Sequence, residues 1–167
     1  MVVLRLQRII IMGNKFFKSS RLSPYQKVVK QYMEIKETYH KIIQSAKINK
    51  NGFEIVMGIT PSENSRTYTV KILYYKNGLP QVILLSPVLQ QYNGKYPHHL
   101  YKRYENGHAR LCVFHPGKDY WDNDMSIAKT FIPWVSTWLN TYEYWLITGE
   151  WHYDETIDDS ETSKEGM

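Results

Sequence analysis

The sequence predicts a single α+β domain with an N-terminal helix, a four-stranded antiparallel meander and a C-terminal helix. Three observations support this prediction. Apolar residues recur at three- and four-residue steps in one segment near each end of the chain. Short apolar runs bounded by Pro, Ser and Asn-Gly turns lie between these segments. The chain has 167 residues, 43% of them hydrophobic, which suits one domain with a sizeable core.

The first helix is predicted to begin at Ser23 and to end near Ala46. Serine is a favoured N-cap, and Pro24 suits the first helical position because its missing N–H would be unpaired there anyway. One apolar stripe follows at helical spacing, with lysines on much of the opposite face. The stripe consists of Tyr25, Val28, Val29, Tyr32, Ile35, Tyr39, Ile42 and Ile43. The Asn49–Gly52 stretch then predicts a turn.

Four strands are predicted after this turn. The second of them alternates between polar and apolar residues, which is typical of a half-buried strand. Asn77-Gly78 after it is a hairpin signal. A long irregular stretch, residues 88–105, is predicted to precede the last strand. The four predicted strands are Phe53 to Ile59, Arg66 to Tyr75, Gln81 to Leu85, and Arg110 to Phe114.

The C-terminal helix is predicted to begin near Asp124 or Ser126 and to reach Thr148. Pro133 should either kink this helix or mark the first turn of its main part, and Gly149 is a natural C-terminal stop. The tryptophans recur at helical spacing, which favours a core role over a stacking surface for bases. The wide apolar face consists of Ile127, Phe131, Trp134, Val135, Trp138, Leu139, Tyr142, Trp145 and Leu146.

Charge divides the chain into a basic body and an acidic tail. The formal net charge is +5, but Asp154 to Met167 holds six acidic residues and one lysine, so the chain before it carries +10. We expect an N-terminal extension over residues 1–22, the domain over 23–151 and an acidic, disordered tail over 152–167. A basic body could meet nucleic acid, an acidic protein partner or an anionic membrane. No basic run or nucleic-acid motif is present, so a solvated lysine-rich surface is favoured, and we expect neither nucleic acid nor a membrane as a partner.

The sequence favours a cytoplasmic location. No apolar run approaches the roughly 20 residues that span a bilayer. Residues 2–11 are apolar but are interrupted by Arg5 and Arg8, and no small-residue cleavage site follows them. With one cysteine in the chain, nothing suggests a disulfide-rich extracellular protein.

Cys112 is the only cysteine, which excludes an intramolecular disulfide and a zinc site of several cysteines. Two readings remain, a small buried apolar residue or a reactive thiol. Leu111 to Phe114 is predicted as a strand end, and His115-Pro116-Gly117 stops it at once. Such a position holds a side chain rigidly within reach of solvent. We therefore expect Cys112 at the rim of a shallow groove bordered by residues 88–105 and 115–123.

Two other uses of this cysteine are poorly supported. His98, His99, His108 and His115 could join Cys112 in a zinc site, but only the pair Cys112/His115 has a usable spacing. We therefore predict no metal and no other cofactor. A papain-like protease is also disfavoured, because its cysteine, histidine and asparagine signatures are missing and the chain is short for that fold.

The order of the predicted elements resembles that of ubiquitin-conjugating enzymes. In that family a catalytic cysteine follows a short strand and an Asn-Gly turn, and an active-site loop then leads to a tryptophan and the next helix. Asn106-Gly107, Leu111-Cys112, Trp121 and Ser126-Ile127 follow this layout at similar spacing. Pro87 and Pro97 lie where the family has its proline-bearing approach to the active site.

A narrower resemblance is to prokaryotic conjugating-enzyme homologues associated with cyclic-oligonucleotide-based antiphage signalling systems (CBASS). It covers about Phe53 to Trp151. Two departures matter: Leu100 to Tyr104 lies where the family has a His-Pro-Asn tripeptide, and His152 to Glu155 replaces an expected glycine-rich ending. The motifs that carry the resemblance are Arg66-Thr67-Tyr68, Leu85-Ser86-Pro87, Arg110-Leu111-Cys112, Ile132-Pro133-Trp134, Trp138-Leu139, Tyr142-Glu143, Trp145-Leu146 and Thr148-Gly149-Glu150-Trp151.

The resemblance implies a stand-alone acyl-transfer enzyme that forms a thioester through Cys112. Its substrate would be the C-terminus of a cyclic-oligonucleotide synthase, a cyclic GMP-AMP synthase-like nucleotidyltransferase. Conjugating that C-terminus to a target would prime antiphage defence. An activating enzyme would come from another chain or be dispensed with. The alternative is a catalytically silent scaffold that binds the synthase or an activating enzyme. The retained cysteine argues against a scaffold, whereas the missing tripeptide argues partly for it.

Three residues near Cys112 are the remaining catalytic candidates. His108 and His115 could lower the thiol pKa or accept a proton, although each could equally be a solvent-exposed loop histidine. Asn106 is the nearest asparagine and could stand in for the family asparagine, but it belongs to a turn. We expect His115 to matter more than His108, because it begins a turn that can fold back over the thiol.

Overall fold

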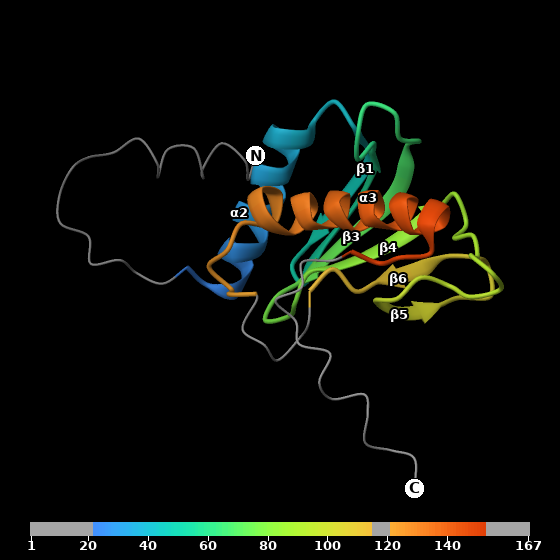
Figure 1. Ribbon diagram of the computed structural model, residues 1–167. Helices are drawn as coiled ribbons and strands as arrows, with labels where there is room; N and C mark the ends of the chain where they lie inside the picture. Colours follow the sequence, from blue (N-terminus) through green and yellow to red (C-terminus); the bar gives the residue numbers. More distant parts are fainter. Residues whose placement is uncertain (1–21, 115–120, 153–167) are drawn as a thin grey trace, which may run out of the picture.

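Six antiparallel strands form one sheet in the computed structural model, which describes residues 22–114 and 121–152. The strand order is β1-β2-β3-β4-β6-β5. Helix α3 crosses one face of this sheet, and helix α2 packs against β1, β2 and the π-helical turn η1 (Figure 1). The elements are α2 (Pro24–Tyr39), β1 (Ile43–Asn49), β2 (Gly52–Ile59), β3 (Tyr68–Tyr75), β4 (Gln81–Ser86), β5 (Leu100–Arg103), β6 (Ala109–Leu111), η1 (Ile127–Phe131) and α3 (Ile132–Thr148).

Helix α2 begins where predicted but ends earlier. The Ser23 hydroxyl accepts a hydrogen bond from the Gln26 N–H, and the Gln26 side chain accepts one from the Ser23 N–H, which forms a capping box. The helix ends at Tyr39, so the prediction of a helix to Ala46 was wrong. After a turn, Ile43–Asn49 forms β1 because its backbone groups pair with β2. Ile42 and Ile43 continue the helical spacing of apolar residues by chance, which is why the sequence predicted a longer helix.

The prediction of a four-stranded meander was also wrong. The predicted strands at 53–59, 66–75 and 81–85 are present as β2, β3 and β4, and β6 is shorter than expected. Strand β1 adds one edge of the sheet, and β5 forms the other within a stretch predicted to be irregular. Three of the four β5 residues are exposed, so an edge strand of this kind has no apolar alternation to reveal it.

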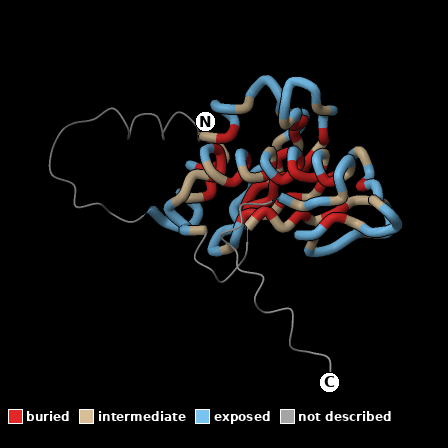
Figure 2. Tube along the Cα trace, viewed as in Figure 1, coloured by how far each residue is buried: buried red, intermediate tan, exposed pale blue. Residues whose placement is uncertain are grey.

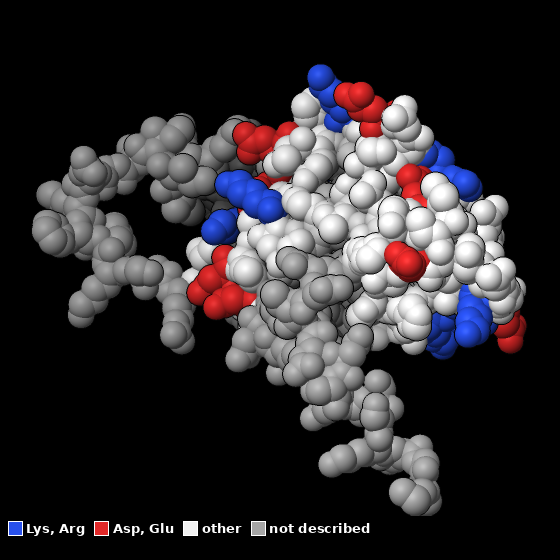
Figure 3. Space-filling view, in the orientation of Figure 1, with Lys and Arg blue, Asp and Glu red and all other residues white. Residues whose placement is uncertain are grey.

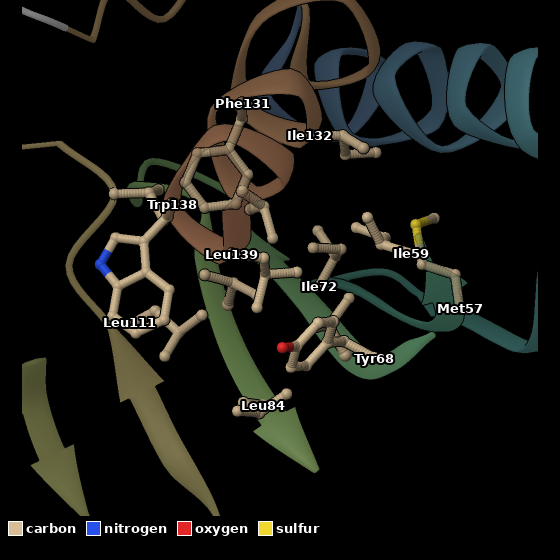
Figure 4. Close-up of a cluster of buried hydrophobic side chains, with 14 of the residues drawn as sticks. Met57, Ile59, Tyr68, Ile72, Leu84, Leu111, Phe131, Ile132, Trp138 and Leu139 are labelled. Atoms are coloured by element: carbon tan, nitrogen blue, oxygen red, sulfur yellow. The ribbon is translucent and has the colours of Figure 1, made fainter. Parts of the chain in front are cut away.

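The core lies between α3 and the sheet. Buried segments in Figure 2 gather where these two layers meet. Phe131, Trp138 and Leu139 pack over side chains of β3 and β4, and the Trp138 indole lies beside Leu111 of β6 (Figure 4). Trp138 has no exposed surface, which agrees with the core role predicted from its spacing.

The two ends of the C-terminal helical block follow their sequence signals. Ser126 caps η1 by accepting a hydrogen bond from the Lys129 N–H. Pro133 lies in the first turn of α3, so it marks the start of the main part of the helix. Gly149 ends the helix with a φ of 77°, a conformation that favours glycine. A Cβ at this position would also collide with the Tyr92 ring.

Most of the predicted terminal segments fall outside the described residues. The structure describes only Leu22 of the expected extension over residues 1–22, and only His152 of the expected tail over 152–167. Within residues 22–114 and 121–152, no helix is long and apolar enough to cross a membrane. Figure 3 shows acidic and basic side chains of these residues interspersed at the margins of one face, whose middle is mostly uncharged.

Helix α2 holds the start of η1 through the buried side chain of Gln31, which is 6% exposed. Its amide nitrogen donates to the Met125 carbonyl at 2.7 Å, and its amide oxygen accepts from the Ile127 N–H at 2.8 Å. The Tyr39 hydroxyl also donates to the Ala128 carbonyl at 2.8 Å. Two side chains of α2 therefore satisfy backbone groups of a π-helical turn.

Replacing Gln31 with leucine should destabilise the fold, because two backbone groups at the entry to η1 lose their partners. A buried polar group left unpaired costs about 1–3 kcal/mol, so we expect a loss of about 2 kcal/mol or more. Urea unfolding followed by tryptophan fluorescence measures the change. Lys30→Leu, at an exposed neighbouring position, is the control. Equal stability of Gln31→Leu and the parent would contradict this account.

Candidate active site

Cys112 follows β6 directly, and its backbone is anchored to the core. Its N–H donates to the His99 carbonyl at 2.9 Å. The Trp138 Nε1–H donates to the same carbonyl at 3.2 Å. The carbonyl oxygen of His99, the residue directly before β5, therefore links the cysteine backbone to the buried tryptophan of α3. This is the rigid strand end that the sequence predicts.

The cysteine itself is neither enclosed in the core nor fully exposed. Its neighbours Leu111 and Val113 are 2% and 3% exposed, whereas Cys112 is half-buried and free. Because side chains alternate along an extended segment, the thiol lies on the other side of the chain from these two core residues. The predicted groove involves residues 115–120, which lie outside the described residues, and it stays a prediction.

The hydroxyl of Tyr101 on β5 shares a hydrogen-bond acceptor with the thiol. This hydroxyl donates to the Phe114 carbonyl at 2.9 Å, and the Cys112 Sγ donates to the same oxygen at 3.4 Å. The Arg110 guanidinium lies 4.9 Å from the centre of the Tyr101 ring. Cys112 therefore lies within a small polar cluster.

Burial controls the protonation of this cluster. It raises the pKa of the Cys112 thiol above its ordinary value, and the Tyr101 hydrogen bond and the Arg110 charge oppose this effect without overcoming it. Burial and the neighbouring thiol also raise the pKa of Tyr101. Tyr101 is therefore a hydrogen-bond donor at neutral pH, and Cys112 is chiefly a thiol until a base or a substrate approaches.

The structure does not bring Asn106 and His108 to the thiol. Both lie in the turn between β5 and β6, where the Asn106 Nδ2 and the His108 Nδ1 are 3.1 Å apart. The Asn106 side chain also accepts a hydrogen bond from the His108 N–H at 3.1 Å. Strand β6 separates this turn from Cys112 by about 13 Å at the usual rise per residue. Any role for them in the chemistry stays a prediction.

His115 lies outside the described residues, but the residues on either side of 115–120 are described. Phe114 before the loop and Trp121 after it have ring centres 6.3 Å apart. Both rings pack on Phe131 and Trp134 at the start of the helical block. This aromatic cluster fixes Phe114 and Trp121, the two described residues on either side of 115–120, and Phe114 is two residues from Cys112.

Tyr101 is the site residue that the sequence analysis missed. Leu100 to Tyr104 was noted only as a replacement for the family tripeptide. No motif marks the tyrosine, and its place beside the thiol depends on the pairing of β5 with β6. No group of three or more histidine, cysteine or acidic side chains that could hold a metal ion occurs among the described residues.

A helix, an antiparallel sheet, a C-terminal helix and a free thiol at a strand end together give the layout expected of an α+β protein of the ubiquitin-conjugating type. The family model described as Type II CBASS E2 protein matches residues 31–159, more than half of the chain. The chain therefore belongs to this family, and the predicted resemblance is confirmed. A search of curated proteins found no match.

Proposed function

We propose that this protein is a conjugating enzyme that carries a protein C-terminus as a thioester on Cys112. The observation that carries the proposal is the position of this thiol. In a member of the Type II CBASS E2 family, the single cysteine is free and half-buried at the end of β6. The sequence resemblance supports the C-terminus of a cyclic-oligonucleotide synthase as the substrate and antiphage defence as the purpose.

The reaction consists of two acyl transfers. In the first, the Cys112 thiolate attacks the carbonyl carbon of a C-terminus that another chain has activated; a C–S bond forms and the activating group leaves. In the second, a target amine attacks the thioester carbon. The C–S bond breaks, its electron pair returns to sulfur, and the amine nitrogen releases its extra proton to water. The products are an amide-linked conjugate and a regenerated cysteine.

Trapping the adduct from cells tests this function. The protein is purified at low pH without reducing agent from cells that also express a cyclic-oligonucleotide synthase, and the Cys112 peptide is identified by mass spectrometry. We expect the C-terminal peptide of the synthase on sulfur, released by hydroxylamine or excess thiol. A stable complex with the synthase in which Cys112 is unmodified would instead support the silent scaffold.

The two histidines near Cys112 in the sequence should differ in their effect on transfer. We expect His115→Ala to lower the single-turnover rate by about 10²-fold, the usual scale for losing a general acid or base. His108→Ala should have a smaller effect, because His108 bonds to Asn106 in a turn at the far end of β6. Rates equal to the parent in both variants would show that neither histidine takes part.

A further inference from the structure

Tyr101 occupies an irregular position in the pairing of β5 with β6. Leu100 pairs with Leu111, and Lys102 pairs with Arg110, the residue directly before Leu111. Tyr101 is therefore the extra residue of a β-bulge. Bulges redirect side chains and are frequent beside active sites. This one lies at the end of the β5–β6 pair from which Cys112 extends.

The hydroxyl and the thiol meet at one acceptor. The Tyr101 O–H and the Cys112 S–H both donate to the Phe114 carbonyl, at 2.9 Å and 3.4 Å. When the thiol loses its proton, Sγ stops donating and becomes an acceptor. The Tyr101 O–H can then turn from the carbonyl toward the sulfur, because both side chains already share the Phe114 carbonyl as their acceptor.

The residues around Tyr101 keep its hydroxyl protonated and able to donate a hydrogen bond. Its raised pKa means that it holds its proton at neutral pH. The Arg110 guanidinium over its ring holds the ring in place and favours negative charge on the sulfur. The titratable groups of the described chain that act on the thiol are Tyr101 on β5 and Arg110 on β6. From helix α3, the Trp138 indole, which does not titrate, donates to the same His99 carbonyl as the Cys112 N–H.

We propose that Tyr101 is a further catalytic residue, whose hydroxyl donates a hydrogen bond to the Cys112 sulfur whenever that sulfur carries negative charge. This role rests on the proposed acyl transfer. Negative charge is on sulfur twice in that reaction, in the thiolate before attack and when the thioester C–S bond breaks. Tyr101 keeps its own proton in both steps. Tyr101 thus provides a hydrogen bond at the thiol in a chain that lacks the asparagine of the family's His-Pro-Asn tripeptide.

The test is the pH dependence of Cys112 alkylation by iodoacetamide in the full chain, where one cysteine gives one signal. Tyr101→Phe removes only the hydroxyl. We expect its alkylation midpoint to move up by about one pH unit, a tenfold loss of thiolate at neutral pH. Tyr104→Phe, on the same β5–β6 hairpin with its ring against Lys102, should keep the parent midpoint. An unchanged midpoint in Tyr101→Phe would overturn the proposal.

Alkylation requires no acyl substrate, so the two proposals can fail separately. An unchanged midpoint alongside a Cys112 adduct in cells would refute the role of Tyr101 and leave the transferase intact. A raised midpoint with no adduct would refute the transferase, and with it any catalytic use of the hydrogen bond. Urea unfolding of Tyr101→Phe confirms an intact fold, which we expect because Tyr101 is 42% exposed.

Discussion

Cys112→Ala should abolish the synthase conjugate completely in cells that carry the whole system. No other residue of the chain can form a thioester, because Cys112 is the only cysteine. Cys112→Ser should instead accumulate an oxyester that persists under mild thiol treatment, since an alkoxide is a poorer leaving group than a thiolate. Gel shift and mass spectrometry of the two variants measure both outcomes.

The control for this experiment is a measurement of whether each variant is folded. Cys112 is half-buried and its backbone, rather than its side chain, holds the bond to His99. Both substitutions should therefore leave the unfolding curve close to that of the parent. An unchanged conjugation pattern in a folded Cys112→Ala protein would end the transferase hypothesis. A third outcome is that Cys112→Ala loses conjugation but Cys112→Ser traps no oxyester. This result would show that the thiol is required, but it would give no evidence of an acyl intermediate.

Trp138→Ala should have the largest effect on stability among single substitutions in α3. Its indole is fully buried, stacks on Tyr142 at 5.8 Å between ring centres and contacts Trp151 at 5.2 Å. Deleting a buried tryptophan side chain costs about 3–5 kcal/mol, a large share of the 5–15 kcal/mol that stabilises a typical domain. We expect partial or complete unfolding, measured by urea titration with circular dichroism.

Trp138→Phe separates packing from hydrogen bonding. It keeps an aromatic ring in the core but leaves the His99 carbonyl with one fewer donor. We expect an intermediate loss of stability. We also expect faster hydrogen exchange at the Cys112 N–H, which shares that carbonyl. Trp134→Phe, at a half-buried position without this bond, is the matched control. Equal exchange at Cys112 in both variants would contradict the anchoring role of Trp138.

Local chemistry accounts for the parts of the fold that the sequence predicted well. Ser23 and Pro24 start α2, Pro133 starts α3 and Gly149 ends it, because each requirement is met within a few residues of the chain. Alternation in residues 66–75 predicts β3 for the same reason. The sequence also predicted that Cys112 lies near a strand end, and it follows β6 directly. However, β6 ends at Leu111 and not at Phe114, and the predicted stop at 115–117 lies outside the described residues.

The tertiary structure decided what depends on pairing between distant segments. Ile43 to Asn49 is a strand and not the end of a helix because β2 supplies its backbone partners. Leu100 to Arg103 is a strand only because β6 inserts beside β4. The same pairing creates the bulge that turns Tyr101 toward Cys112, and it places Asn106 and His108 at the opposite end of β6. Sequence periodicity reports which face of an element is apolar. Strand register is set by hydrogen bonds between segments, and among the described residues this register placed Tyr101 on the same carbonyl as the thiol.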